Sequence, residues 1–316
     1  VMNTIKLTMS QALTKWMTNQ KIEQFTSKHE NAFVGVWGIF GHGNVAGLGE
    51  ALFDVKDKLP TFRGHNEQGM AHAAISFAKQ KKRRQMMAVT SSIGPGATNF
   101  LTACALAYVN RLPVLFLPGD IFANRLPDPV LQQTENFADA TVSANDCFKP
   151  ISRFFDRITR PEQIIQSLPK AMSVLTDPAD CGPVTLSLCQ DVQSEAYNYP
   201  ETFFEPKVWK IRRQPCDFDE LDNVIKKINS SKKPLIIVGG GVKYSGAKTE
   251  LENLINSTGI PFAVTQAGKS SLDETNSKFV GSIGVTGSSV ANELAKKSDL
   301  VISVGSRLQD LSLIHI

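Results

Sequence analysis

Residues 63–80 read RGHNEQGMAHAAISFAKQ, and the rest of the chain is interpreted around this stretch. After Gly64 the sequence becomes strongly helical, because alanine is the best helix former and occurs four times here. Met70, Ala74 and Phe77 recur at helical spacing and give the helix one apolar face. Its small residues would allow close packing against a sheet or a partner subunit.

Glu67 stands where this stretch changes from loop to helix. A carboxylate is favoured in the first turn of a helix, because the dipole and the free backbone N–H groups stabilise negative charge there. A solvated first-turn glutamate and a functional carboxylate both fit this position. Motifs elsewhere in the chain must decide between them.

The composition is that of an ordinary globular protein, and its 316 residues suggest two domains. A net charge of +4 without a long basic run gives no reason to expect nucleic acid as a partner. The five cysteines show no metal-ligand spacing, which fits a reducing cytosol. No apolar run reaches the roughly 18 residues of a membrane span, and the N-terminus lacks the apolar region of a signal peptide. We therefore expect a cytoplasmic protein that does not contact a membrane.

The pattern of strands predicts an α/β fold with a doubly wound parallel sheet. Buried-strand sequences occur at residues 32–40, 85–90 and 114–117, and each runs through a turn towards the next helical segment. A second α/β pattern at residues 218–310 predicts a Rossmann-like central domain that is incomplete. Its three glycines at 239–241 fit a nucleotide site and a tight strand-to-helix turn equally well.

These patterns predict the domain boundaries. Residues 1–189 form the first domain, and the proline-containing residues 190–217 are expected to be a linker. Residues 218–310 form the second domain. Residues 311–316, LSLIHI, break the preceding pattern and match the translation of a common sequencing-library adaptor, so we exclude them from functional reasoning.

Two glycine-rich turns mark a candidate ligand site. The turn after the first strand places His42 and Asn44 at the carboxyl end of a strand, where open α/β sheets bind ligands. Its glycine spacing does not match the dinucleotide fingerprint, so it is only a weak signal for NAD. In the second turn, Gly94 and Gly96 flank Pro95, and the backbone there can approach a ligand closely.

The polar loop at residues 122–136 is a candidate substrate surface. Pro127 and Pro129 prevent a long helix, and the loop carries Arg125 and Gln133 beside apolar residues. A solvated connector fits the same sequence equally well.

The order of these motifs resembles one enzyme family. The segments HNEQGMAHAA (65–74), SIGPGATN (92–99) and VLFLPGD (114–120) are similar to thiamine-diphosphate enzymes of the acetolactate-synthase type. Two further segments, IFGHGNVAGLG (39–49) and PDPVLQQ (127–133), resemble the branch that opens a cyclic dione by hydrolysis during myo-inositol breakdown. The resemblance covers residues 2–310.

The resemblance implies particular roles for residues of this chain. In the family, the glutamate before the alanine-rich helix contacts N1′ of the cofactor and exchanges a proton with it, which assigns that role to Glu67. The glutamine near the substrate corresponds to Gln133. His42 and His65 are candidates for proton transfer and rank above His72, which a core histidine would also explain. The implied catalytic residues are Glu67, His42 and His65; the implied cofactor contacts are Glu67, Gly94, Pro95, Gly96 and Asn99; the substrate candidates are Asn44, Arg125 and Gln133.

The same resemblance implies Mg²⁺ as a second cofactor and a dimer or tetramer as the assembly. In the family, a Gly-Asp-Gly…Asn segment of a third domain holds Mg²⁺ and the diphosphate, and that domain meets the glutamate-bearing domain of another subunit. Residues 1–316 contain no such segment, so we expect no metal ligand in this chain and no activity from it alone.

Two other functions remain open. A carboligase or 2-oxo acid decarboxylase of the same family would share Glu67 but act on a 2-oxo acid. A non-catalytic α/β binding module would need neither the cofactor nor a reactive carboxylate.

Overall fold

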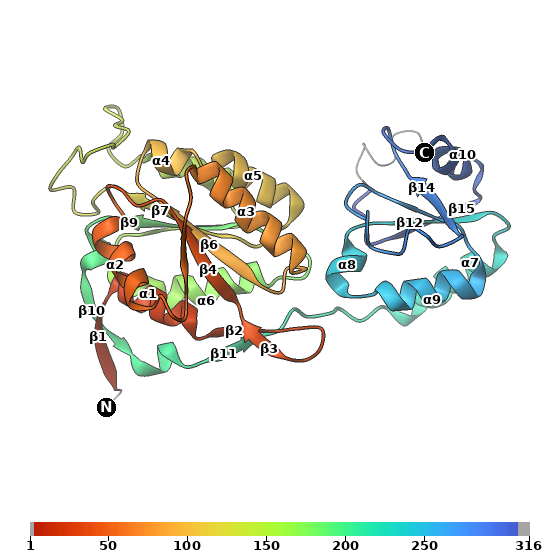
Figure 1. The fold of residues 1–316 in the computed structure, drawn as a ribbon, viewed down its shortest axis with the longest axis horizontal. Coiled ribbons are helices and arrows are strands. Elements are labelled where there is room, and N and C mark those ends of the chain that lie inside the picture. Colours follow the sequence, from red (N-terminus) through yellow and green to blue (C-terminus); the bar gives the residue numbers. More distant parts are fainter. Residues whose placement is uncertain (1–2, 309–316) are drawn as a thin grey trace. The chain divides into compact units, whose positions relative to one another are not determined.

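The structure is a computed structural model that describes residues 3–308. The chain divides into two compact units, Val1–Arg212 and Arg213–Ile316, each built around its own sheet (Figure 1). No helix among the described residues has the length and apolar character that crossing a bilayer requires. The expectations for residues 309–316 concern positions outside the described range.

The first unit is built on six strands that are all parallel, which confirms the predicted sheet. Strands β6 (Met86–Ser91), β7 (Leu115–Asp120) and β9 (Val184–Cys189) are buried along their whole length, because helices cover both faces of the sheet. In spatial order the strands are β5 (Thr61–Arg63), β4 (Phe33–Gly38), β6 (Met86–Ser91), β7 (Leu115–Asp120), β9 (Val184–Cys189) and β8 (Phe154–Ile158).

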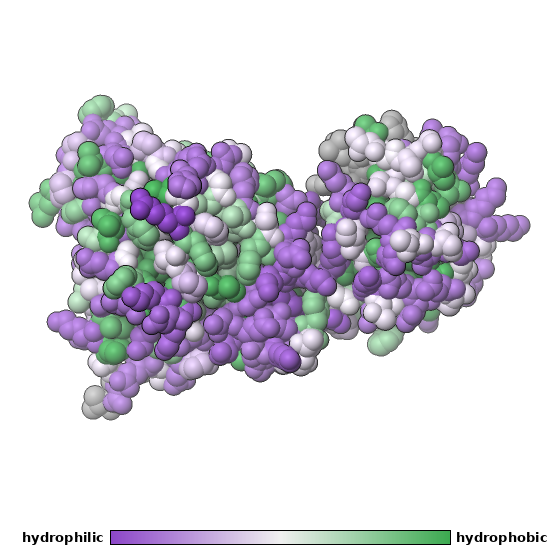
Figure 2. All heavy atoms as spheres, viewed as in Figure 1, coloured by the Kyte–Doolittle hydropathy of each residue, from purple (hydrophilic) through white to green (hydrophobic). Residues whose placement is uncertain are grey.

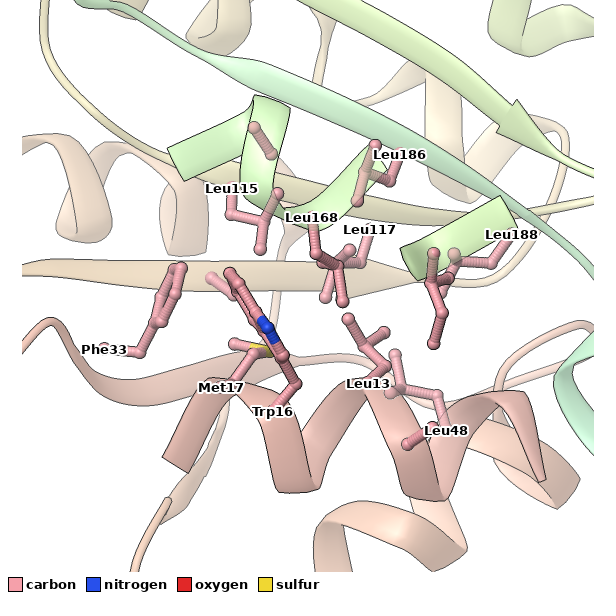
Figure 3. Packing of buried hydrophobic residues seen from close by; sticks show 14 of the residues in the cluster. Leu13, Trp16, Met17, Phe33, Leu48, Leu115, Leu117, Leu168, Leu186 and Leu188 are labelled. Carbon is pink, nitrogen blue, oxygen red and sulfur yellow. The ribbon is translucent and has the colours of Figure 1, made fainter. Parts of the chain in front are cut away.

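The helices of this unit lie on the two faces of the sheet (Figure 1). One face carries α3 (Glu67–Gln80) and α5 (Leu101–Asn110), and the other carries α1 (Met9–Thr18) and α6 (Ile164–Leu175). Side chains of α1 and α6 pack against β7 and β9, as Figure 3 shows for Leu13, Trp16 and Leu168. The helices are α1 (Met9–Thr18), α2 (Glu50–Asp54), α3 (Glu67–Gln80), α4 (Pro95–Thr98), α5 (Leu101–Asn110) and α6 (Ile164–Leu175). They form the two helical layers, one on each face, that a doubly wound sheet requires.

The order of the strands creates a crevice beside β4. From β4 the chain runs to β5 on one side and then to β6 on the other, so the connections leave in opposite directions. Open α/β sheets bind ligands at such a switch point, outside the carboxyl ends of the strands. Both glycine-rich turns follow strands at this point.

The predicted linker is wrong over most of its length. Strand β10 (Ala196–Pro200) pairs with β1 (Thr4–Thr8), and β11 (Lys207–Trp209) pairs with β2 (Gln20–Glu23), which also pairs with β3 (His29–Asn31). Tyr199 and Phe204 are buried in the core of the first unit. The prolines that suggested a linker therefore lie in and between short strands and turns. Buried aromatic side chains pack the segment against the first unit.

The second unit contains a four-stranded parallel sheet, as expected for a Rossmann-like domain. Its strands, in spatial order, are β14 (Phe279–Ser282), β13 (Phe262–Val264), β12 (Pro234–Val238) and β15 (Leu300–Val304). Its helices are α7 (Phe218–Ser230), α8 (Gly241–Ser245), α9 (Lys248–Thr258) and α10 (Ser289–Lys297).

The glycines after β12 are explained by backbone packing. A Cβ on Gly239 would lie 2.3 Å from the carbonyl oxygen of Gly305, and Gly241 donates its N–H to the same oxygen at 2.9 Å. This close approach of two loops favours the tight-turn interpretation over a nucleotide site.

Candidate active site

A cavity of about 520 Å³ lies at the switch point of the first unit. The turn after β4, the loop after β6 and the start of α3 all contribute to it. The residues that line it are Ile39, Phe40, Gly41, His42, Glu67, Ser92, Pro95, Gly96, Leu131 and Gln132. The fold thus brings both glycine motifs and Glu67 to one place.

Glu67 is held in a defined orientation at the start of α3. Asn66 caps the helix by accepting a hydrogen bond from the N–H of Gly69 at 2.8 Å. Asn99 donates from Nδ2 to Oε2 of Glu67 at 2.7 Å. The carboxylate is half-buried and lines the cavity, so a freely solvated first-turn glutamate does not describe it. Asn99, expected as a cofactor contact, is the residue that orients Glu67.

Two glycines of the second turn are required by close contacts. Gly94 has φ +58°, and a Cβ there would lie 1.9 Å from the carbonyl oxygen of Gln132. A Cβ on Gly96 would lie 2.5 Å from Oγ of Ser92 and 3.4 Å from Oε1 of Glu67. Gly96 therefore keeps open the space beside the carboxylate, whereas Gly94 allows the loop at 121–142 to rest on the turn.

Asn44 does not line the cavity, and its side chain stabilises the first glycine turn instead. It is only 2% exposed, accepts from the N–H of Gly41 at 2.9 Å and donates to the carbonyl of Ile39 at 3.1 Å. It also donates to Oγ1 of Thr90 at 3.2 Å. Because both ends of the amide are engaged within the protein, the expected substrate contact by Asn44 is replaced by a structural role.

The histidines differ in their positions. His42 lines the cavity together with Glu67. His65 is exposed and does not line it, and His72 is half-buried within α3. The structure therefore brings one of the two preferred histidines to the carboxylate.

The polar loop reaches the cavity through residues that sequence reasoning missed. Leu131 and Gln132 line it, whereas exposed Arg125 does not. Gln133 is engaged within its own loop: Oε1 accepts from the N–H of Val130 at 2.9 Å, and Nε2 donates to Asp128 at 2.7 Å. Gln132 rather than Gln133 therefore lies at the cavity, and nothing in the sequence distinguishes these two adjacent glutamines.

A polar network centred on the buried Asp120 anchors the base of the same loop. Arg157 donates from Nε to Asp120 at 2.8 Å and from Nη2 to Asp146 at 2.8 Å. Ser187 donates to Asp120 at 2.5 Å. Although burial opposes it, the two carboxylates raise the pKa of Arg157 above its ordinary value. This network connects the ends of β7, β8 and β9 to the segment that follows the loop.

The cavity is chemically suited to the aminopyrimidine ring of thiamine diphosphate. It offers an oriented carboxylate, a glycine whose missing Cβ leaves space beside that carboxylate, and apolar walls from Ile39, Phe40 and Leu131. Within residues 3–308 there is no group of three or more His, Cys, Asp or Glu side chains that could hold a metal ion.

Comparison with protein families supports the same assignment. Residues 8–140 match the thiamine pyrophosphate enzyme N-terminal TPP binding domain. Residues 221–315 match the thiamine pyrophosphate enzyme central domain. Together the two matches extend over both structural units.

Curated relatives are similar along nearly the whole chain. A 3D-(3,5/4)-trihydroxycyclohexane-1,2-dione hydrolase from Geobacillus thermodenitrificans (strain NG80-2) is 50% identical over 98% of this chain. Proteins with the same name from Clostridium tetani and Bacillus cereus (strain AH820) are 49% and 48% identical over the same share. In each case the match covers 48% of the relative, so the chain spans about half the length of these proteins.

Proposed function

The chain belongs to the thiamine pyrophosphate enzymes, and we propose that the intact protein opens trihydroxycyclohexane-1,2-dione by hydrolysis of a carbon–carbon bond. The product is 5-deoxy-glucuronate, and the reaction belongs to inositol degradation. One observation carries the proposal: the Glu67 carboxylate, oriented by Asn99, lines a cavity at the switch point of the parallel sheet.

Several residues at the cavity have separate tasks in this reaction. When bound, thiamine diphosphate supplies an electron sink for the bond that breaks. Asn99 leaves Oε1 of Glu67 available, so this oxygen holds and exchanges the proton at the pyrimidine ring. Pro95 and Gly96 border the space for that ring, and His42 moves protons at the substrate.

We propose that Mg²⁺ and the diphosphate are held by residues outside 3–308. A cytoplasmic location is supported by free thiols in the first unit. Cys104 and Cys181 are both free and buried in the first unit, and unpaired cysteines are typical of a reducing compartment.

The experiment for this function is cofactor removal from the intact protein. Dione opening should disappear in the stripped protein and return when thiamine diphosphate and Mg²⁺ are added together. Ring opening that persists without the cofactor would contradict the proposal. Turnover of 2-oxo acids without any opening of the dione would favour a carboligase or decarboxylase, and cofactor binding without either reaction would indicate a binding module.

We also propose that the intact protein is a dimer or tetramer that associates through α3 and α5. These helices pack side by side, and Leu106 and Val109 of α5 remain exposed. Figure 2 shows green and white spheres over the part of the first unit where Figure 1 draws α3.

Leu106→Glu should raise the dissociation constant of the dimer at least about tenfold, because burying an unpaired charge is unfavourable. Leu254→Glu is the matched control: Leu254 lies on α9 of the second unit and is 39% exposed, the same fraction as Leu106. Sedimentation velocity on both variants measures the effect. Equal dissociation constants for the two variants, or a wild-type protein that stays monomeric with cofactor bound, would contradict this interface.

A further inference from the structure

Two polar side chains in the cavity have no task in the proposed chemistry, namely those of Ser92 and Gln132. Oγ of Ser92 lies 3.4 Å from Oε1 of Gln132 and 3.5 Å from the carbonyl oxygen of Ile93. Both distances exceed the 2.7–2.8 Å typical of O–H···O hydrogen bonds. Among residues 3–308, Nε2 of Gln132 has no hydrogen-bond partner. The pair therefore has unused donors and acceptors at the cavity wall.

The backbone holds both residues in place before any ligand arrives. Gln132 has φ +66°, and its carbonyl oxygen rests against Gly94, where any side chain would collide with it. Ser92 is 8% exposed and its Oγ occupies the space beside Gly96 that a Cβ there would need. Polar groups fixed in this way can bind a ligand without a large loss of side-chain entropy.

The start of the loop that carries Gln132 is also fixed. Asp191, just after β9, accepts hydrogen bonds from the N–H groups of Ala123 at 2.9 Å and Asn124 at 3.1 Å. At its far end, Ser143 accepts from Nη2 of Arg157 at 3.0 Å. Both ends of the loop are thus tied to the carboxyl edge of the sheet, which limits how far Gln132 can move.

The chemistry of the pair indicates the kind of ligand. A hydroxyl and a carboxamide together offer donors and acceptors but no charge, which suits hydroxyl and carbonyl groups on adjacent carbons. None of the described residues that line the cavity is Arg or Lys, the side chains that recognise a carboxylate. The cavity is therefore better suited to a neutral polyol ring than to a 2-oxo acid.

We propose that Ser92 and Gln132 form the subsite that recognises the ring hydroxyls of the substrate and so determine specificity. The proposal rests on the function proposed above and adds to it the residues that distinguish a hydroxylated ring from a bare one. Gln133, adjacent and of the same type, takes no part in this recognition, because its amide is engaged within the loop.

The test compares two substrates in the intact protein loaded with cofactor. Wild type, Ser92→Ala, Gln132→Ala and Gln133→Ala are each assayed with the trihydroxylated dione and with unsubstituted cyclohexane-1,2-dione. Gln132→Ala and Ser92→Ala should each lower kcat/KM for the hydroxylated dione about tenfold, mainly by raising KM. The same two variants should change kcat/KM for unsubstituted cyclohexane-1,2-dione far less. Gln133→Ala should leave the ratio of the two kcat/KM values unchanged.

A binding measurement without turnover provides the second readout. The dissociation constant of myo-inositol, an unreactive ring polyol, should rise in Gln132→Ala and Ser92→Ala but not in Gln133→Ala, as measured by calorimetry. Equal losses with both diones, or a change of substrate ratio in Gln133→Ala alone, would overturn the subsite. If wild type opens neither dione, the proposed function and the subsite both fail; if it opens the hydroxylated dione without these differences, only the subsite fails.

Discussion

Replacing Glu67 by glutamine in the intact protein should slow dione opening by roughly 10²–10⁴-fold while thiamine diphosphate still binds. Glutamine keeps the size of the side chain and can still accept the hydrogen bond from Asn99. It cannot exchange a proton at the position of Oε1. The loss should therefore lie in kcat, with little change in the affinity for the cofactor.

A second first-turn glutamate provides the control for this variant. Glu50 lies in the first turn of α2, is exposed, and does not line the cavity. Glu50→Gln should leave the rate unchanged, since a solvated carboxylate at this position contributes only to the helix end. If Glu67→Gln behaved like Glu50→Gln, the carboxylate would have no catalytic task.

Replacing Arg157 by leucine should destabilise the first unit by about 3–5 kcal/mol. The guanidinium pairs with Asp120, whose side chain is 3% exposed, and its removal leaves that charge buried without a cation. The same change releases the contact with Asp146 at the end of the polar loop. We therefore expect weaker substrate binding as well as lower stability.

Urea unfolding of the 316-residue chain, followed by tryptophan fluorescence, measures this effect in the first unit alone. The only tryptophans of the chain are Trp16, Trp37 and Trp209, and all three lie in that unit. Arg160→Leu is the control, since Arg160 pairs with Glu162 at 2.6 Å on the surface, and its midpoint should shift far less. Adding Asp120→Asn to Arg157→Leu should restore part of the lost free energy of unfolding, because it removes the buried carboxylate charge that has no cation beside it. Equal shifts for the two arginine variants would contradict a structural role for the buried pair.

The parts of the fold that could be predicted from the sequence are those with strong local patterns. Residues 32–40 and 85–90 have the continuous apolar runs of buried parallel strands, and both occur as strands β4 and β6. The segment at 190–212 has no such period, because its strands are short and pair with residues nearly 200 positions away. Pairing over that distance is not visible in a local pattern, so prolines suggested a linker.

Some residues of the candidate site could likewise be predicted from the sequence, and others could not. Glu67, His42, Pro95 and Gly96 lie shortly after the ends of strands in one sheet. The switch-point rule places such positions together. Which of Gln132 and Gln133 reaches the cavity depends on the left-handed backbone at Gln132 and on the hydrogen bonds that hold the amide of Gln133 within the loop. Neither is encoded in the composition of the loop.

The most direct test of the account is the exchange of the C2 proton of bound thiamine diphosphate with deuterium, followed by NMR after acid quenching. We predict that the intact wild-type protein accelerates this exchange and that Glu67→Gln slows it by at least about 100-fold relative to wild type, with cofactor occupancy unchanged. An exchange rate that is the same in wild type and Glu67→Gln would remove Glu67 from the chemistry and contradict the account.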